Sequence, residues 1–313
     1  MYQIIVNPAA KSGRGRKLWA DLESEFLRRG LDYEVHFSKR EGFVTALVRK
    51  LSEAWEAGGH AGPLKLIILG GDGTVNEALQ GISDFSRVEI GYIPTGSSND
   101  LARDLKLPKD TKKILDSILS GEKRRVMDIG EISFGDGRPS RYFAVSSGIG
   151  FDAAVCAEVL TSKLKKTLNK VRLGKLIYLM IALKQLIAAK KVAADIYLDD
   201  AIEPIHIKKL FFAAAMVHKF EGGGFKFCPG ADYEDGLLDV CMVGGLSKPL
   251  LLCALPFAFG GKHYVFPHVE VYRVKRIRIK VSAPLWVHTD GEVEKKDKTV
   301  TMSCHGHRLR LLC

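Results

Sequence analysis

A glycine-rich turn in the N-terminal half of the sequence has the composition of a phosphate-binding loop. The turn, Gly70-Gly71-Asp72-Gly73-Thr74, follows the apolar run Leu64–Leu69 and precedes a predicted helix. Glycines let a backbone turn tightly and approach a ligand, and the first amides of a helix offer unpaired N–H groups to phosphate. The alternative is an ordinary strand-to-helix turn in which Asp72 or Thr74 caps the helix. Taken alone, the turn fits both interpretations.

Two further loops repeat this arrangement. Pro94–Asp100 follows the next apolar strand, and Asn7–Gly13 follows the first one. Because parallel strands end at the same edge of a sheet, we expect these loops to face one ligand. The basic residues beside the first loop could attract phosphate or could be solvated surface charges: Lys11, Arg14, Arg16 and Lys17. Neither G-x-x-x-x-G-K-[ST] nor G-x-G-x-x-G is present, so a P-loop NTPase and a Rossmann dehydrogenase are not supported.

The C-terminal half carries two acidic turns. Asp290-Gly291-Glu292 is, by itself, the signature of a hairpin turn. The stretch from Asp232 to Leu237 is a polar turn before an apolar strand, with carboxylates close enough together to suit a hard cation. We assign no metal to Cys304-His305-Gly306-His307, because successive residues of a strand point to opposite faces.

The elements that must position these residues fall into two groups. Up to about residue 125 the chain alternates strand and helix, which predicts a parallel sheet covered on both faces. The runs are Tyr2–Val6, Lys17–Gly30, Asp32–Phe37, Glu41–Ala57, Leu64–Leu69, Thr74–Leu79, Val88–Ile93 and Asn99–Leu105. After it, strand follows strand, which predicts an antiparallel domain interrupted by one helical region, Phe151–Lys191. The predicted strands are Val126–Phe134, Arg141–Ser147, Pro204–Val217, Leu237–Val243 and Val269–Val281.

Composition narrows the class of partner. The 313 residues fit two packed domains. Lys and Arg number 47 against 36 Asp and Glu, a formal charge of +11, which favours polyanionic partners. The six cysteines form no C-x-x-C pair, the N-terminus lacks a signal-peptide pattern, and no apolar run is long enough to span a membrane. We therefore expect a cytoplasmic protein whose contact with membrane, if any, is peripheral.

The motifs together closely resemble the diacylglycerol kinase catalytic family, which includes sphingosine kinases and bacterial lipid kinases. The N-terminal half contains N-P-x-x-x-x-G, G-G-D-G-T-V-N-E and G-S-x-N-D-x-A-R. The C-terminal half continues the family's order with the segments 126–130, 148–153, 229–231, 235–240 and 290–292. The resemblance covers nearly the whole chain. One departure is Ser97, where the family usually has threonine; the hydroxyl is kept.

The resemblance implies an α/β nucleotide-binding domain, similar to phosphofructokinase and NAD kinase, packed against a mainly antiparallel β-sandwich. The first domain would span residues 1–126 together with about 300–313, where the final strands return. The second, lipid-substrate domain would span 127–299. ATP would lie in the cleft with Mg²⁺.

The family match also implies roles for individual residues. ATP would be held by Asn7, Ser38, Gly70, Gly71, Asp72, Gly73, Thr74, Asn76, Ser97, Asn99 and Asp100. Asp72 would orient the nucleotide and its Mg²⁺. Glu292 would be the general base, since a carboxylate can accept the hydroxyl proton without leaving a cation beside the transferred group. Asp128 would be a second carboxylate near the cleft.

A structural Mg²⁺ is implied at Asp232, Asp235 and the backbone carbonyl of Leu237. It would fix a loop of the second domain and would not activate phosphate. The family usually carries an apolar residue at the position of Asp232, so its coordination through side chain or backbone stays open. The alternative is a polar β-turn without metal.

The segment Ser162–Lys191 alternates basic with apolar residues, which suits a helix on an anionic membrane or an ordinary helix with a solvated basic face. The resemblance implies a lipid substrate at an anionic membrane surface and allows a homodimer. No helix-turn-helix, finger or aromatic RNA-binding motif points to nucleic acid.

The resemblance thus implies an ATP-dependent lipid kinase. It favours diacylglycerol as acceptor and phosphatidic acid as product, while a sphingoid base, phosphatidylglycerol or another hydroxyl lipid stays open, because acyl-chain pockets are built from interchangeable apolar side chains. One alternative is a soluble NAD kinase-like enzyme, which would share the nucleotide loops without requiring Asp235-Gly236 or Asp290-Gly291-Glu292. Another is a non-catalytic nucleotide-binding or anionic-lipid-binding protein of the same fold, which loss of Asp72 or Glu292 would have favoured. Both residues are present.

Overall fold

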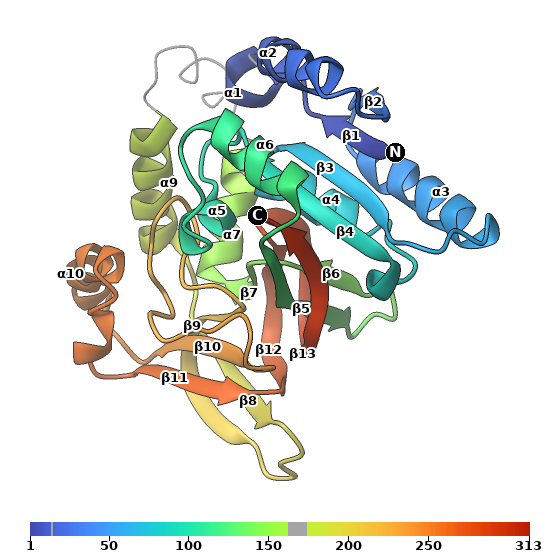
Figure 1. The fold of residues 1–313 in the computed structure, drawn as a ribbon. Coiled ribbons are helices and arrows are strands. Elements are labelled where there is room, and N and C mark those ends of the chain that lie inside the picture. Colours follow the sequence, from blue (N-terminus) through green and yellow to red (C-terminus); the bar gives the residue numbers. More distant parts are fainter. Residues whose placement is uncertain (14, 162–173) are drawn as a thin grey trace. The chain divides into compact units, whose positions relative to one another are not determined.

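The computed structural model describes residues 1–13, 15–161 and 174–313. The chain divides into two compact units (Figure 1). Unit 1 comprises Met1–Asp128 and Gly306–Cys313, and unit 2 comprises Ile129–His305. Two strands run from one unit into the other: β5 (Arg124–Phe134) and β13 (Glu292–Leu312).

Unit 1 is built on a parallel sheet. Its strands are β1 (Tyr2–Val6), β2 (Tyr33–Phe37), β3 (Leu64–Gly70) and β4 (Val88–Pro94), paired in the order β2-β1-β3-β4. Arg310–Leu312 of β13 pair in parallel with β4. The central strands read as continuous apolar runs because both of their faces are buried.

Helices cover both faces of this sheet. They are α1 (Ala10–Gly13), α2 (Gly15–Arg28), α3 (Phe43–Ala57), α4 (Asp72–Leu79), α5 (Asp100–Asp104) and α6 (Thr111–Ser120), with a short 3-10 turn η1 (Phe85–Arg87). Helices α2 and α6 share one apolar cluster with alternate residues of β1 and β3, including Trp19, Ile118, Val6 and Leu69. Helices α3 and α4 contact each other and belong to the opposite face.

Unit 2 is built from antiparallel strands, as the sequence predicts. They are β6 (Arg141–Phe143), β7 (Ser146–Gly150), β8 (Val192–Leu198), β9 (Ile205–Met216), β10 (Leu238–Gly244), β11 (Val269–Val274) and β12 (Arg276–Thr289), together with parts of β5 and β13. The pairing order is β11-β10-β9-β7-β12-β13, and β8 also pairs with both β9 and β12. Alternate residues of these strands enclose an apolar core that includes Ile196, Val240 and Val287.

Two predicted strands of unit 2 are each broken into two. Arg141–Ser147 ends at Phe143 and restarts at Ser146, because the N–H groups of Ala144 and Val145 donate to the carboxylate of Asp290. Val269–Val281 is broken at Lys275, whose N–H donates to Asp199. A carboxylate from a distant segment replaces the partner strand at each break.

The helices of unit 2 are α7 (Phe151–Thr161), α9 (Gly174–Ala188) and α10 (Lys248–Phe259), followed by the 3-10 turn η3 (His263–Val265). The predicted helical region Phe151–Lys191 therefore contains α7 and α9, while its basic residues Lys163, Lys165, Lys166, Lys170 and Arg172 lie outside the described residues. Helices α9 and α10 pack over a second apolar cluster with β9. Of the helices within the described ranges, none is long and apolar enough to cross a membrane.

Candidate functional site

The structure brings the three predicted phosphate-binding loops together at one edge of the unit 1 sheet. The side-chain amide of Asn7, after β1, donates to the hydroxyl of Thr74 over 3.4 Å. The N–H of Thr95, after β4, donates to the carbonyl of Gly70 over 2.7 Å. Ser38 reaches the same edge, since its N–H donates to Val6 over 2.9 Å. The carboxyl ends of β1, β2, β3 and β4 therefore form one surface.

Two glycines allow the loops after β3 and β4 to meet. A Cβ atom on Gly71 would lie 3.0 Å from the Cα of Gly96, and a Cβ on Gly96 would lie 2.6 Å from the Cα of Gly71. Separations this short exclude any side chain unless the backbone moves. These two glycines thus serve loop-to-loop packing, in addition to the approach of a ligand that the sequence predicts.

Asp72 ties the first of these loops to the second. Its carboxylate accepts from the hydroxyl of Tyr92 over 3.1 Å and from the N–H of Asp100 over 2.8 Å. Burial, with the adjacent Asp72 charge, raises the pKa of Tyr92 well above its ordinary value, so the phenol keeps its proton and donates. Asp100 in turn pairs with Arg103. Asp72 therefore has a positioning role that was not predicted from the sequence. Tyr92 is a further site residue that was not predicted.

Two buried polar atoms in the loop after β4 lack a hydrogen-bond partner: the hydroxyl of Thr95 and the side-chain oxygen of Asn99. The amide nitrogen of Asn99 is already fixed, because it donates to the carbonyl of Gly96 over 3.0 Å. Buried polar groups normally have partners, so atoms left without one mark a place for a ligand. A phosphate oxygen can accept from Thr95, and a nucleotide hydroxyl or amine can donate to Asn99.

The remaining predicted nucleotide residues lie in the same elements. Asn76 is buried in α4, where its carbonyl accepts from the side chain of Gln80 over 3.0 Å, and Ser97 is exposed in the loop after β4. Helix α4 begins at Asp72 with its first amides at the strand edge. The unpaired atoms, the close-packed glycines and the helix N-terminus fit a phosphate-bearing nucleotide.

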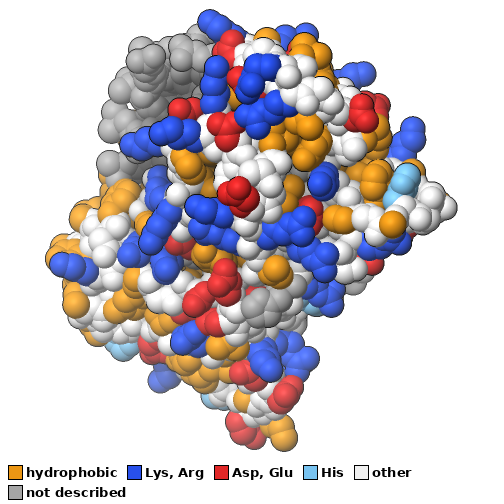
Figure 2. Space-filling view, in the orientation of Figure 1, with side chains coloured by type: hydrophobic (Ala, Val, Ile, Leu, Met, Phe, Trp, Pro, Cys, Tyr) orange, Lys and Arg blue, Asp and Glu red, His pale blue; other side chains and the backbone are white. Residues whose placement is uncertain are grey.

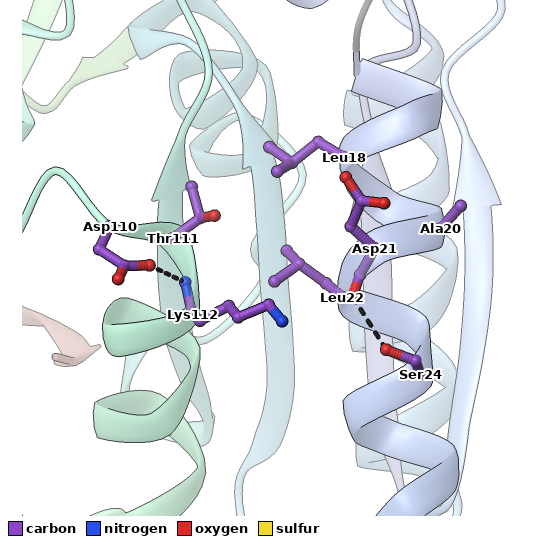
Figure 3. Close-up of a pocket in the computed structure, with 8 residues that line it drawn as sticks. All are labelled: Leu18, Ala20, Asp21, Leu22, Ser24, Asp110, Thr111 and Lys112. Carbon is purple, nitrogen blue, oxygen red and sulfur yellow. Dashed lines mark hydrogen bonds between the residues drawn. The ribbon is translucent and has the colours of Figure 1, made fainter.

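A groove of about 550 Å³ lies elsewhere in unit 1, between α2 and α6 (Figure 3). Leu18, Asp21 and Leu22 of α2 face Thr111 and Lys112 at the start of α6. The polar groups there serve the helices: Asp110 caps α6 by accepting from the N–H of Lys112 over 2.9 Å. This groove contains none of the predicted site residues.

In unit 2, Glu292 begins β13 directly after a tight hairpin turn. Asp290 and Gly291 both have positive φ, at 50° and 82° respectively, which is the geometry of a two-residue hairpin of the type expected from Asp-Gly. The carboxylate of Asp290 accepts three backbone N–H groups, from Ala144, Val145 and Ser146, over 2.8 to 2.9 Å. The turn that presents Glu292 is therefore anchored to the start of β7.

A buried imidazole supports the same turn from the other side. His288 is fully buried in β12, and its Nδ1 accepts from the N–H of Gly291 over 3.2 Å. Its Nε2 lies 3.0 Å from an oxygen of Asp152 and 3.2 Å from an oxygen of Glu221. Asp152 stands at the start of α7, and Glu221 lies between β9 and β10. None of these three residues is assigned a role from the sequence.

The three side chains have the donor types of a metal centre, and their ligand atoms lie within 4.8 Å of one another. The hydrogen bond from the Gly291 N–H indicates that the three side chains form a hydrogen-bonded group and not a metal centre. Because this N–H donates to Nδ1, the imidazole proton sits on Nε2, which removes the lone pair that a cation would need. Burial raises the pKa of Asp152 above its ordinary value. We interpret the group as a hydrogen-bonded support for the Asp290-Gly291 turn.

The predicted structural-metal loop has hard oxygen donors, but several are engaged. Asp235 accepts from the N–H of Leu237 over 2.9 Å and pairs with Arg273, and Asp232 accepts from the N–H of Glu234 over 3.0 Å. The charge of Arg273 weakens attraction for a cation at Asp235. The donor set thus fits Mg²⁺ only in part. Asp128 is fully buried in β5, at the end of unit 1.

Comparison with known proteins agrees with this arrangement. Residues 1–132 match the model of the diacylglycerol kinase catalytic domain, and residues 144–313 match that of the YegS C-terminal NAD kinase beta sandwich-like domain. The chain therefore belongs to the diacylglycerol kinase catalytic family, a family of lipid kinases. This result confirms both the family and the fold class expected from the sequence.

Individual relatives cover most of the chain. A putative lipid kinase, YtlR, of Bacillus subtilis is 28% identical over 299 residues, covering 92% of each chain. A diacylglycerol kinase of Mycobacterium tuberculosis (strain H37Rv) is 30% identical over 230 residues, covering 72% of this chain and 70% of the relative.

Solved structures share the fold. A putative diacylglycerol kinase from Bacillus anthracis has a TM-score of 0.74 at 20% identity, covering 99% of this chain and 96% of the other. An NAD kinase from Archaeoglobus fulgidus in complex with ATP has a TM-score of 0.51 at 12% identity, covering 100% and 94%. At these identities the likeness concerns architecture alone.

Proposed function

We propose that this protein transfers the γ-phosphate of ATP to the hydroxyl of diacylglycerol, forming phosphatidic acid at an anionic membrane surface. Membership of a lipid kinase family supports phosphoryl transfer to a lipid. Relatives across most of the chain are named diacylglycerol kinases, which favours that acceptor. The formal charge of +11 suits both ATP and anionic headgroups.

One observation carries the proposal most strongly: the predicted nucleotide loops converge at one sheet edge that still has unpaired buried polar atoms. Thr95 and Asn99 supply those atoms, and Gly71 and Gly96 allow the two loops to pack closely together. The phosphates of ATP would be bound by Asn7, Ser38, Ser97 and the turn Gly70–Thr74. Mg²⁺, when bound with ATP, would neutralise phosphate charge.

Glu292 is the proposed general base. A fixed carboxylate can take the proton of an attacking hydroxyl, and positioned groups of this kind accelerate proton transfer by about 10²- to 10⁴-fold. The anchored turn before it suits that role, because Asp290 and His288 hold the backbone on both sides. The reaction requires that Glu292 reach the hydroxyl while the loops of unit 1 hold the nucleotide.

The acceptor can be identified from a mixture. The protein is incubated with ATP, Mg²⁺ and mixed micelles containing diacylglycerol, sphingosine and phosphatidylglycerol, and products are identified by mass spectrometry, with NAD tested in parallel. We expect phosphatidic acid, absent when Glu292→Gln replaces the wild type. Phosphorylation of another lipid would correct the acceptor, and formation of NADP alone would replace the proposal by the NAD kinase alternative.

A further inference from the structure

Helix α10 of unit 2 has an apolar outer face. Its inward positions are Leu251, Ala254 and Ala258, which are buried. The outward positions recur with helical spacing and carry no charge: Pro249, Leu252, Cys253, Pro256 and Phe257. A surface helix of a soluble protein normally presents charged and polar residues on that side. This helix is apolar all round although one side is exposed.

Large side chains make the exposed surface substantial. Leu252 is 48% exposed, Phe257 46% and Phe259 52%, and Val265 of the following η3 turn is 74% exposed. Ile187, near the end of the neighbouring helix α9, is 69% exposed. These five residues define the α10 surface. Figure 1 locates helix α10, and Figure 2 shows hydrophobic side chains gathered over it.

The aromatic rings of this surface are held in place by packing. Phe257 packs edge-on against Phe266 with ring centroids 5.3 Å apart, and Phe259 stacks on Phe225 at 4.0 Å. Each ring is therefore fixed by a neighbour and still about half exposed. Contiguous apolar surface that is rigid and uncovered marks an interaction site.

The charged residues of the segment that contains α10 and η3 are all basic. No Asp or Glu occurs between Val240 and Val269, while Lys248 and Lys262 stand at the two ends of the helix. At the junction with α9, Lys191 contacts the carbonyl of Leu246 and Lys248 contacts that of Ile187, which places further positive charge there. A second copy of the chain would bring like charges together at this rim, whereas anionic headgroups complement it.

We propose that the α10 surface docks unit 2 on an anionic lipid bilayer, with Leu252, Phe257 and Val265 among the acyl chains and Lys248 and Lys262 at the headgroups. Apolar and aromatic residues flanked by lysines are the composition of interfacial helices. This inference rests on the proposed function, because it supplies the surface by which a lipid kinase would reach an acceptor held in a membrane.

The test is sedimentation with vesicles of equal parts phosphatidylcholine and phosphatidylglycerol. Phe257→Ser should weaken binding about tenfold, since each buried large apolar side chain contributes on that scale. Leu252→Ser, at a position with less ring packing, should weaken it by a similar factor. The matched control is Ile202→Ser, which removes an equally apolar side chain, 88% exposed, from the segment between β8 and β9. It should bind as the wild type does.

Charge is tested separately with Lys262→Gln, which should weaken binding to the anionic vesicles about fivefold and leave binding to pure phosphatidylcholine unchanged. Equal urea midpoints for all variants would establish that they are folded. The proposal would be overturned if Phe257→Ser and Leu252→Ser both bound vesicles as tightly as the wild type. It would also be overturned if Ile202→Ser weakened vesicle binding as much as they do. A dimer at sedimentation equilibrium that only the α10 variants dissociate would overturn it as well.

Activity distinguishes this inference from the proposed function. Dioctanoylglycerol supplied below its micelle-forming concentration should be phosphorylated equally by the wild type and Phe257→Ser, because no bilayer is involved. Loss of vesicle binding with that activity retained supports the α10 surface. Vesicle binding that depends on Phe257 without phosphorylation of any lipid would refute the proposed function and leave the surface standing.

Discussion

The nucleotide loops of unit 1 and the hairpin of unit 2 are built in different ways. In unit 1, each loop is a contiguous motif at the end of a parallel strand, and contacts such as Asp72 to Asp100 join loops that follow neighbouring strands. In unit 2, the turn before Glu292 is held by groups far away in the sequence: the backbone of 144–146, and Asp152 and Glu221 through His288. The site residues of unit 1 are positioned by local motifs, and the hairpin turn of unit 2 is positioned by tertiary contacts.

Sequence patterns carry more information about the site residues of unit 1 than about those of unit 2. A parallel sheet places successive strand ends at one edge, so motifs after those strands converge as a consequence of topology. The topology of an antiparallel domain does not bring successive loops to one edge in this way. The position of its site residues depends on hydrogen bonds between buried polar groups and backbone amides that are distant in the sequence. We therefore expect substitutions at the site in unit 2 to lower turnover without changing nucleotide affinity. Substitutions in the loops of unit 1 should disturb loop structure and nucleotide affinity together.

The largest expected effect is on turnover in Glu292→Gln. The amide cannot accept the hydroxyl proton, so kcat should fall by about 10²- to 10⁴-fold. The dissociation constant for ATP should stay within about threefold of wild type, because the nucleotide loops belong to unit 1. Steady-state kinetics and calorimetric ATP titration measure the two quantities. Full turnover would remove Glu292 from the role of base.

The next effect is on stability, in Asp290→Ala. Three backbone N–H groups would lose a charged acceptor, which we expect to cost about 3 kcal/mol of the free energy of unfolding. Urea denaturation monitored by tryptophan fluorescence measures the loss. Asp290→Asn keeps one acceptor oxygen and should lose about half as much. Equal stability of wild type and Asp290→Ala would mean that the anchor is not needed.

Asp72→Asn probes the corresponding anchor of unit 1. An amide offers one acceptor oxygen, so it cannot serve both Tyr92 and the N–H of Asp100, and it also removes the charge proposed to engage Mg²⁺. We expect ATP affinity to fall about tenfold or more. Tyr92→Phe is the control, since it removes one donor and keeps the carboxylate. If Asp72→Asn leaves both ATP affinity and turnover unchanged, the loop assignment is wrong.

The smallest effect concerns pH and His263, a buried residue of unit 2. Burial lowers the pKa of His263 to about 4 from an ordinary 6.5, so the folded protein holds this ring neutral while the unfolded chain can protonate it. Stability is therefore lost as the pH falls from 6.5 towards 4. Between pH 7 and pH 5 the loss from this group should be about 2 kcal/mol at most.

The measurement for His263 is the urea midpoint at both pH values in wild type and His263→Gln. The glutamine does not titrate, so the variant should lose less stability on acidification than the wild type. Identical losses in the two proteins would assign the acid sensitivity to other groups.

Much of unit 1 could be predicted from the sequence. Strands buried on both faces appear as short apolar runs, and the turn motifs that follow them are local. The helix α6 was missed although its signals are present: Asp110 as a cap and apolar residues at helical spacing. Tyr92 was missed because nothing in the sequence of a buried strand shows that one phenol will meet the carboxylate of Asp72.

The sequence predicts the antiparallel class of unit 2 but not the bounds of all its strands and helices. The breaks at Ala144 and Lys275 depend on Asp290 and Asp199, which lie far away in the sequence. Strand β8 begins directly after the predicted helical region and was not among the predicted strands. Helix α10 contains Pro256, which usually argues against a helix interior. The carbonyl that this proline cannot bond belongs to Leu252, a residue that is 48% exposed.

The hydrogen-bonded group of Asp152, Glu221 and His288 had no sequence signal apart from the position of Asp152 in a family motif. Its members come from α7, the segment after β9, and β12, and no spacing rule relates them. Buried polar groups of this kind become visible only when the fold has brought them together.

Phosphoryl transfer from ATP to a lipid hydroxyl can be measured with a single acceptor. Wild-type protein is mixed with Mg²⁺, ATP labelled in the γ-phosphate and dispersed dioctanoylglycerol, and the organic phase is counted over time beside a parallel reaction with NAD. We expect label in phosphatidic acid and none in NADP. Label in NADP alone, or release of free phosphate with no labelled lipid, would contradict this expectation.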